Sequence, residues 1–148
     1  MVATYENPRA LALSLASVAR LAPGPGSIAV ADDGSGPDTR AVVEAFAAGS
    51  QVPVRHVWHE DEGFRKNAIL NRAIATSEAG FLVFIDGDVL VRPDFFGHHR
   101  ALARPDRWSS GSLIRLDAAA TAAVTPALVA SGEVFGRAWL RTHRAVDR

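Results

Sequence analysis

The sequence predicts an α/β fold in which a mainly parallel sheet is sandwiched by helices within a single domain. Short apolar segments and helical patterns alternate at regular spacing, which is typical of parallel strands joined by crossover helices. The chain has 148 residues, of which 48% are hydrophobic and 22% are charged. A chain of this length and composition can bury a core and is not expected to be disordered. We expect its crossovers to be right-handed.

The first three strands are expected at 2–5, 27–31 and 52–58. A helix follows the first strand, because Asn7 can cap it and Pro8 suits its first turn. A second helix begins near residue 37, and Gly49 is placed to end it.

A run of five apolar residues, 81–85, is too short for a buried helix and predicts a strand covered on both faces. It ends at Asp86-Gly87-Asp88. In open α/β sheets, ligands collect at the carboxyl ends of the strands. Two acids there repel each other unless a cation lies between them, and hard divalent cations prefer carboxylate oxygens. Asp86 and Asp88 therefore form a candidate metal site, with an ordinary polar turn as the alternative.

Two further groups are expected at the same edge of the sheet. Asp32 and Asp33 follow the second strand, where their alternative role is to cap the next turn. Arg65 and Lys66, the latter the only lysine in the chain, precede a helix that ends near residue 75. Free backbone N–H groups at a helix start favour an anion. Carboxylates that hold a cation opposite basic groups fit a metal-bound diphosphate.

The remainder of the chain is expected to be mostly helical. Pro93 opens a helix, 107–116 can form another strand, and 117–148 is a helical C-terminal extension that Asp117 caps. His98 and His99 are adjacent on a helix and point in different directions, so we assign them packing or surface roles rather than a shared metal ion.

Composition limits the partners. The formal net charge is +0, so no attraction to nucleic acid is expected. Cysteine is absent, which excludes disulfides and thiolate metal sites and fits a reducing compartment. No apolar run is long enough to span a bilayer, and the first residues do not form a signal peptide. We expect a cytoplasmic protein. Contact of the C-terminal arginines, at positions 137, 141, 144 and 148, with the inner face of the membrane is an alternative.

These motifs together resemble family 2 glycosyltransferases, which have the GT-A, Rossmann-like fold. The matching segments fall in the family's order within 2–116: Thr4-Tyr5-Glu6-Asn7-Pro8, Asp32-Asp33-Gly34-Ser35, Glu60-Asp61-Glu62-Gly63-Phe64-Arg65-Lys66-Asn67 with Leu70-Asn71-Arg72-Ala73-Ile74, and Phe84-Ile85-Asp86-Gly87-Asp88.

The resemblance implies roles for the candidate residues. Asp32 or Asp33 would contact the base and ribose of a nucleotide. Arg65 and Lys66 would lie near the diphosphate or order the loop beside it. The Asp86-Gly87-Asp88 segment would hold Mn²⁺ or Mg²⁺ against the diphosphate.

The implied reaction transfers a sugar, with inversion, from a UDP- or GDP-type nucleotide-diphospho-sugar to a hydroxyl of a sugar, lipid or protein acceptor. No catalytic base is assigned, because Glu133 and Asp147, the acids after Asp117, lie in no matching motif. The chain therefore resembles the donor-binding half of such an enzyme, shortened at its C-terminus and trimmed at its N-terminus.

Two other functions stay open. A non-catalytic module that binds a nucleotide sugar or a partner protein is the first alternative. An aspartate-nucleophile phosphatase is less favoured, because Val89-Leu90 follow the acid pair where those enzymes carry glycine and then a hydroxyl residue. A short chain of this type is also expected to expose apolar surface and to self-associate as a homo-oligomer.

Overall fold

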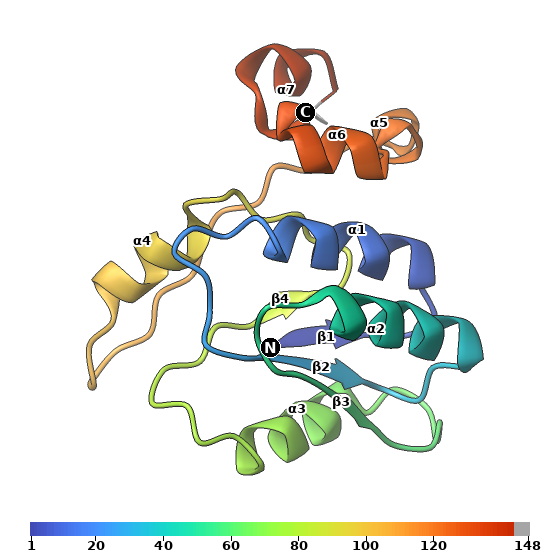
Figure 1. Cartoon of the computed structure of the whole chain (residues 1–148), viewed down its shortest axis with the longest axis vertical. Helices are drawn as coiled ribbons and strands as arrows, with labels where there is room; N and C mark the ends of the chain where they lie inside the picture. The colour runs from blue at the N-terminus through green and yellow to red at the C-terminus, as the bar shows by residue number, and fades with distance from the viewer. Residues whose placement is uncertain (144–148) are drawn as a thin grey trace. The chain divides into compact units, whose positions relative to one another are not determined.

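The computed structural model describes residues 1–143, and the chain forms two compact units with their boundary between Ala101 and Leu102. The first unit carries the sheet and its covering helices (Figure 1). The predicted parallel α/β architecture is confirmed, and it lies within this unit. The predicted helices after residue 117 belong to the second unit.

The sheet of the first unit has four parallel strands in the order β3-β2-β1-β4. The strands are β1 (Val2–Thr4), β2 (Ile28–Asp32), β3 (Val54–Trp58) and β4 (Ile85–Asp86). Thr4 and Trp58 both pair with Asp32, and Ala3 pairs with Asp86. Because all strands run the same way, both acid pairs come to one edge of the sheet.

Helices cover both faces of this sheet (Figure 1). They are α1 (Pro8–Val18), α2 (Pro37–Gly49) and α3 (Lys66–Ala75), and α4 (Phe95–Leu102) follows the last strand. The predicted cap of the first helix is confirmed, because Asn7 Oδ1 accepts the backbone N–H of Ala10 at 3.1 Å. The second helix ends at Gly49, as expected.

Strand β2 is the centre of the unit, because all five of its residues are buried. On one face its residues Ile28 and Val30 join a cluster with Leu11 and Leu15 of α1. On the other face Ala31 packs with residues of α3. The alternation of side chains along a strand therefore distributes β2 between two apolar layers.

The predicted buried strand at 81–85 is wrong. Strand β4 contains only Ile85–Asp86, lies at the sheet edge, and leaves Phe84 47% exposed. Its neighbour β1 is three residues long and offers register partners to Ile85 and Asp86 only. An apolar run indicates burial but does not determine how many partners the adjacent strand supplies.

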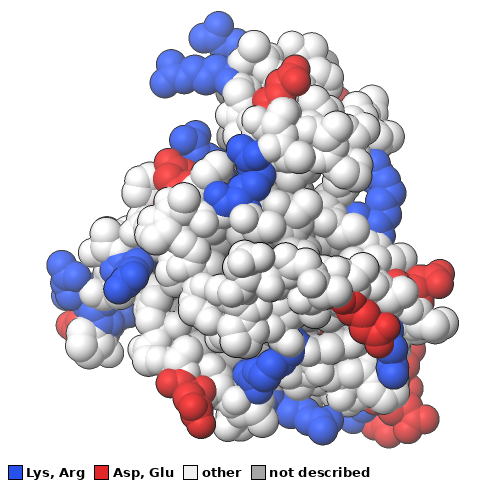
Figure 2. All heavy atoms as spheres, in the orientation of Figure 1, with Lys and Arg blue, Asp and Glu red and all other residues white. Residues whose placement is uncertain are grey.

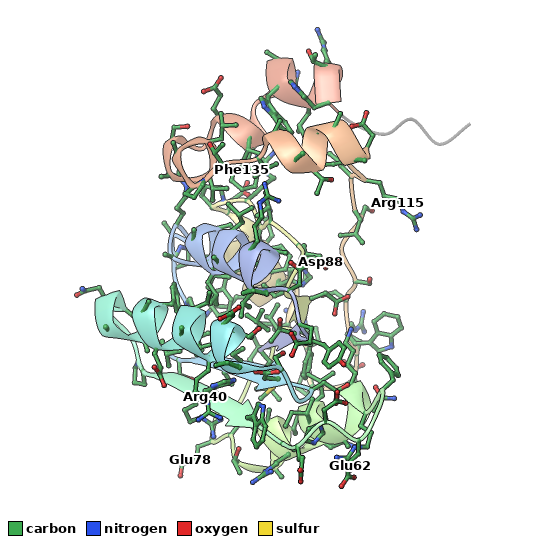
Figure 3. All side chains as sticks on the ribbon, turned by 90° about the vertical axis from the view of Figure 1, so that its right-hand side faces the viewer. Arg40, Glu62, Glu78, Asp88, Arg115 and Phe135 are labelled. Atoms are coloured by element: carbon green, nitrogen blue, oxygen red, sulfur yellow. The ribbon has the colours of Figure 1, made fainter. Side chains whose placement is uncertain are left out.

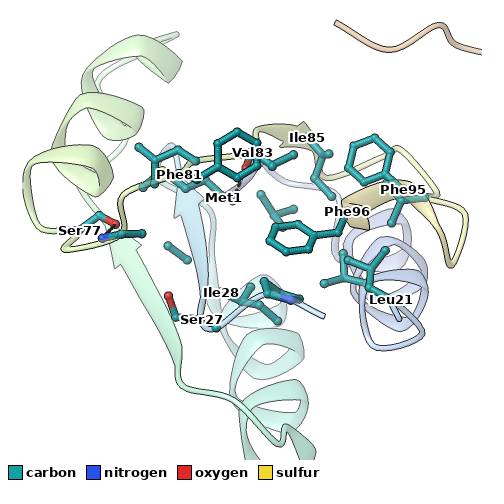
Figure 4. Close-up of a pocket in the computed structure, with 18 of the residues that line it drawn as sticks. Met1, Leu21, Ser27, Ile28, Ser77, Phe81, Val83, Ile85, Phe95 and Phe96 are labelled. Carbon is teal, nitrogen blue, oxygen red and sulfur yellow. Dashed lines mark hydrogen bonds between the residues drawn. The ribbon is translucent and has the colours of Figure 1, made fainter. Parts of the chain in front are cut away.

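The residues before β4 instead help to line an apolar cavity of about 140 Å³ near the amino-terminal ends of the strands (Figure 4). Phe81 and the α4 residues Phe95 and Phe96 lie around the start of β2, where Ile28 is labelled. The strand ends opposite to the acid pairs are thus closed mainly by apolar side chains.

The second unit contains helices and an extended segment. The helices are α5 (Ala118–Ala123), α6 (Pro126–Ser131), the 3₁₀ helix η1 (Glu133–Phe135) and α7 (Arg137–His143). Asp117 Oδ1 accepts the backbone N–H of Ala120 at 2.7 Å, so the predicted cap is confirmed. Positions 144, 147 and 148, named above, lie outside the described residues.

The predicted strand at 107–116 is wrong, because within this stretch only Arg107, which pairs with Arg104, and Leu116 take part in bridges, and these do not extend into a strand. Trp108 is 86% exposed. A strand needs partners along its length, and 108–115 are not paired with another strand. Within residues 1–143 no helix has the length and apolar character needed to cross a bilayer.

Candidate functional site

The carboxyl ends of β1, β2 and β4 border a cleft of about 250 Å³. In Figure 1 the arrows of β1 and β2 point toward the edge of the sheet that carries this cleft. Figure 3 looks onto that edge and labels Asp88 there. The lining residues come from four separate segments: Ala3, Thr4, Tyr5, Asn7, Asp33, Phe64, Lys66, Asp86, Gly87 and Asp88.

Asp32 is a structural anchor rather than part of the cleft. Its side chain is 0% exposed, and it accepts the backbone N–H of Ser35 at 2.9 Å while its other oxygen lies 2.8 Å from His56 Nε2. Burial by itself would raise the pKa of this carboxyl, but the hydrogen bonds from His56 and Ser35 outweigh it and leave the pKa lowered. Asp32 therefore joins β2, β3 and the following turn.

Asp33 is the member of this pair that reaches the cleft. It is 4% exposed, with Oδ1 2.7 Å from His59 Nε2 and Oδ2 accepting the backbone N–H of Arg65 at 2.9 Å. These two contacts tie the end of β2 to the segment that enters α3. A carboxylate oxygen has two lone pairs, so each oxygen can still accept a hydrogen bond from a ligand.

The loop between β3 and α3 is held closely against the end of β2. Gly34 has φ of +102°, and a Cβ there would lie 2.6 Å from the Cα of Asp61. Tyr5 donates its hydroxyl proton to Asp61 Oδ2 at 3.0 Å, and this bond raises the pKa of Tyr5. The contacts set the position of Tyr5 and of Phe64, which is 88% exposed at the border of the cleft.

The two basic residues predicted for the site have different environments. Arg65 directs its guanidinium to its own loop, where it pairs with Glu62 at 2.6 Å and donates to the Glu60 carbonyl at 3.0 Å. Lys66, the first residue of α3, lines the cleft and forms an ion pair with Asp86 through Nζ and Oδ1. Of the two roles expected for Arg65, the geometry supports ordering of the loop.

The exposed acid pair stands on a tightly packed turn. Gly87 donates its N–H to the Ala3 carbonyl at 2.7 Å, and a Cβ at this glycine would lie 2.9 Å from the same oxygen. The turn therefore fits against the end of β1 only without a side chain. Asp86 and Asp88, on either side, are exposed and line the cleft.

The donor set fits a hard divalent cation that is shared with a phosphate. Within residues 1–143 no three or more His, Cys, Asp or Glu side chains are grouped so that they alone could hold a metal ion. Nucleotide-bound Mg²⁺ uses one or two carboxylates, with phosphate and water oxygens as its other ligands. Asp86 and Asp88 supply that number and type of ligand. Two carboxylates are too few to hold the ion without phosphate or water oxygens as further ligands.

The electrostatics of the cleft are set locally. The chain carries 16 basic and 16 acidic residues, and Figure 2 shows the two signs interspersed on the face that it draws. Exposed charges beyond about 10 Å are screened at ordinary salt. Lys66 and the nearby carboxylates therefore determine what charge the cleft attracts.

Four contributors to this site were not predicted as site residues: His56, His59, Tyr5 and Phe64. His59 directly follows the third strand, and its signal was that neighbouring parallel strands end at the same edge. His56 lies two residues before the end of that strand. Trp58 has a packing role: its indole N–H donates to the Ser35 carbonyl at 3.0 Å, and Arg40, labelled in Figure 3, lies over its ring.

Comparison with known proteins agrees with this geometry. The family model for glycosyl transferase family 2 matches residues 1–107, a range that includes every residue of the cleft. The chain belongs to this family. The motif resemblance and the GT-A-like α/β fold are thereby confirmed.

A curated relative gives a second comparison. The chain is 31% identical over 97 residues to a validoxylamine A glucosyltransferase of Streptomyces hygroscopicus subsp. limoneus. The match covers 64% of this chain and 21% of that protein, so the chain corresponds to about a fifth of the relative's length.

Proposed function

We propose that this chain is the donor-binding domain of a glycosyltransferase that takes a nucleotide-diphospho-sugar. The observation that carries the proposal is the cleft itself, where an exposed acid pair, a lysine at a helix start and a fixed buried carboxylate meet at one edge of the sheet. Membership of glycosyl transferase family 2 supports the same reading.

Asp33 and Tyr5 would receive the nucleoside. Asp33 presents a carboxylate held in place by two protein contacts, and an acceptor of this kind fits the ring N–H on the pairing edge of uracil and guanine, which adenine and cytosine lack. The ring of Tyr5 lies in the same cleft and offers a half-exposed aromatic surface to a base. This pair favours a UDP- or GDP-type donor.

Asp86 and Asp88 would hold Mn²⁺ or Mg²⁺ at the diphosphate, and Lys66 would add a positive charge beside it. When bound, the ion supplies Lewis-acid stabilisation of the charge on the leaving diphosphate. Lys66 is well placed for the same purpose, because it begins α3, whose free N–H groups and dipole favour an anion.

In the proposed reaction, an acceptor hydroxyl oxygen forms a bond to the anomeric carbon as the bond from that carbon to the diphosphate oxygen breaks. The electron pair leaves with the nucleoside diphosphate, and the hydroxyl proton passes to a base. No described residue is assigned as this base. The sugar, lipid or protein nature of the acceptor stays a prediction, as do self-association and contact with the inner face of a membrane.

The missing assignment of a base favours one alternative, a domain that binds a nucleotide sugar without transferring it. Incubation with UDP-glucose, Mn²⁺ and simple sugar acceptors separates the two functions. Release of UDP or formation of a glycoside supports the enzyme, whereas binding without either product supports the binding domain.

The donor site is tested by calorimetric titration of UDP, GDP and UDP-glucose into the protein with Mn²⁺ and then with EDTA. We expect binding that needs the ion and weakens by about 10- to 100-fold in the double variant Asp86→Asn/Asp88→Asn. Asp94→Asn is the matched control, because Asp94 is a half-exposed acid that pairs with Arg92 outside the cleft. Nucleotide binding that is unchanged by EDTA and by the double substitution would contradict the proposed metal site.

A further inference from the structure

We propose that Lys66 is an exchangeable counter-ion of Asp86, which makes metal binding conditional on the arrival of a diphosphate. In the absence of nucleotide the ammonium group neutralises the carboxylate that the metal needs. When a nucleoside diphosphate enters, Lys66 turns to the phosphate oxygens and leaves Asp86 to the ion. This inference rests on the proposed function, because it concerns the same cleft.

The first support is the ion pair itself. Lys66 Nζ contacts Asp86 Oδ1 across the cleft, although the two residues are 20 positions apart in the sequence. Among the described residues that line the cleft, Lys66 alone carries a positive charge. Its neighbour Arg65 cannot take over easily, because its guanidinium is already engaged by Glu62 and the Glu60 carbonyl.

The second support is that the helix carrying Lys66 is held by packing and a hydrogen bond, whereas the Lys66 side chain is partly exposed. The backbone N–H of Arg65 is bound to Asp33, and α3 is packed on the sheet through Ile69, which is 0% exposed. The Lys66 side chain is 34% exposed and that of Asp86 57% exposed. An ion pair this open to water is weak, so the four-carbon side chain can change partners without moving the helix.

The charges of the cleft indicate that the diphosphate must arrive before, or together with, the metal ion. A divalent cation that approaches Asp86 in the absence of nucleotide meets the ammonium group of Lys66 beside the same carboxylate, and like charges repel. A diphosphate adds several negative charges at the start of α3, where an anion is favoured. Lys66 and the ion then have separate partners. The cleft should therefore bind the metal–nucleotide pair much better than the metal alone.

The exchange is tested by measuring Mn²⁺ affinity through the electron paramagnetic resonance signal of free Mn²⁺, first with no nucleotide and then with saturating UDP or GDP. Wild type is compared with Lys66→Met, which removes the charge and keeps the length of the side chain. Arg72→Met is the matched control, because Arg72 lies on the same helix but donates to the Trp58 carbonyl outside the cleft. Circular dichroism verifies that each variant is folded.

Without nucleotide, we expect Lys66→Met to bind Mn²⁺ about fivefold more tightly than wild type. With nucleotide, the order reverses and Lys66→Met binds the Mn²⁺–nucleotide pair about tenfold more weakly, because a charge-assisted hydrogen bond to phosphate is lost. Lys66→Arg, which keeps the charge, should resemble wild type without nucleotide, and Arg72→Met should resemble it in both conditions.

Equal or weaker binding of Mn²⁺ alone by Lys66→Met would overturn the exchange, even if wild type binds UDP well. The converse result is also informative. If neither UDP nor GDP binds wild type with Mn²⁺ present, the proposed donor site fails, while tighter Mn²⁺ binding by Lys66→Met would still support competition between the lysine and the metal. The two failures are therefore distinguishable.

Discussion

Asp32–Asp33 and Asp86–Asp88 end two strands of the same sheet, but the first pair is buried and the second is exposed. Strand β2 is central, so its carboxylates come to lie beside the end of β3, where His56 and His59 meet them. Strand β4 is an edge strand, and its acids face the open cleft. The position of a strand within the sheet thus decides whether an acid at its end supports the structure or is available to a ligand.

Asp33 and the Asp86–Asp88 pair divide the cleft into a rigid side and an adjustable side. Asp33 is held by a histidine and a backbone N–H, neither of which can move without the loop. Asp86 is held by one flexible lysine side chain. Under the proposed function, the fixed carboxylate of Asp33 would select the base of the ligand. The movable Lys66 side chain would neutralise the charge of its phosphates.

The largest expected effect is the difference in unfolding free energy between substitutions in the buried acid pair and in the exposed acid pair. Asp32→Ala should lower the free energy of unfolding by roughly 4 kcal/mol, because it leaves His56 and the Ser35 N–H without their buried partner. Asp88→Ala should change it by less than about 0.5 kcal/mol, since the side chain is exposed. Urea denaturation measures both, and similar losses in the two variants would contradict the division.

The glycines next to the acids give the next effect. Gly34→Ala should cost roughly 3 kcal/mol of unfolding free energy, because its φ of +102° is unfavourable for alanine and the Cβ would meet Asp61 at 2.6 Å. Gly87→Ala should cost about 2 kcal/mol, from the contacts of the added Cβ with the Ala3 carbonyl and the Thr4 side chain.

Gly63→Ala is the control for this pair of variants, since its φ is +86° and nothing lies within 4 Å of the added Cβ. It should cost about 1 kcal/mol. If thermal unfolding ranked Gly63→Ala as the most damaging of the three, the close packing of the two acid turns would not be what stabilises them.

His59 tests how firmly Asp33 must be held. His59→Leu removes a hydrogen bond from a nearly buried carboxylate and should cost about 2 kcal/mol of unfolding free energy. It should also weaken UDP binding, because the orientation of Asp33 is no longer set. His59→Gln keeps an N–H donor and should recover part of both losses. A loss of stability with UDP affinity unchanged would show that Asp33 does not contact the nucleotide.

The smallest effect is the pH dependence that comes from Asp32. Its pKa in the folded chain lies below the ordinary value of 3.8, so the unfolded chain binds the proton more readily. The stabilisation is present above about pH 4 and is lost as the pH falls through the lowered pKa. Asp32→Asn should flatten this part of the stability curve, measured by urea denaturation at several pH values. An unchanged slope would contradict the role of the buried pair.

Much of the fold followed from local patterns. The caps at Asn7 and Asp117, the order of strands and helices, and the meeting of both acid pairs at one edge were predicted and are found. The buried strand at 81–85 and the strand at 107–116 were predicted and are wrong. Both errors have one cause, because a strand depends on partners that its own residues do not specify.

The sequence predicted most of the residues that line the candidate site, but not the contacts that these residues make. Lys66, Asp33, Asp86 and Asp88 line one cleft, whereas Asp32 is buried behind it and Arg65 turns to its own loop. A side chain as long as that of arginine reaches several partners, and its choice depends on the acids that the loop brings near.

The sequence by itself determined the α/β order, the helix ends and the motifs that place the chain in glycosyl transferase family 2, because caps, periodicity and motif order are properties of neighbouring residues. Only the tertiary structure decided which acid pair is buried, which pair meets the solvent, and which basic group meets which acid. Those choices depend on contacts such as His56–Asp32, His59–Asp33 and Lys66–Asp86, whose partners are 24, 26 and 20 residues apart. They exist only after the strands have assembled.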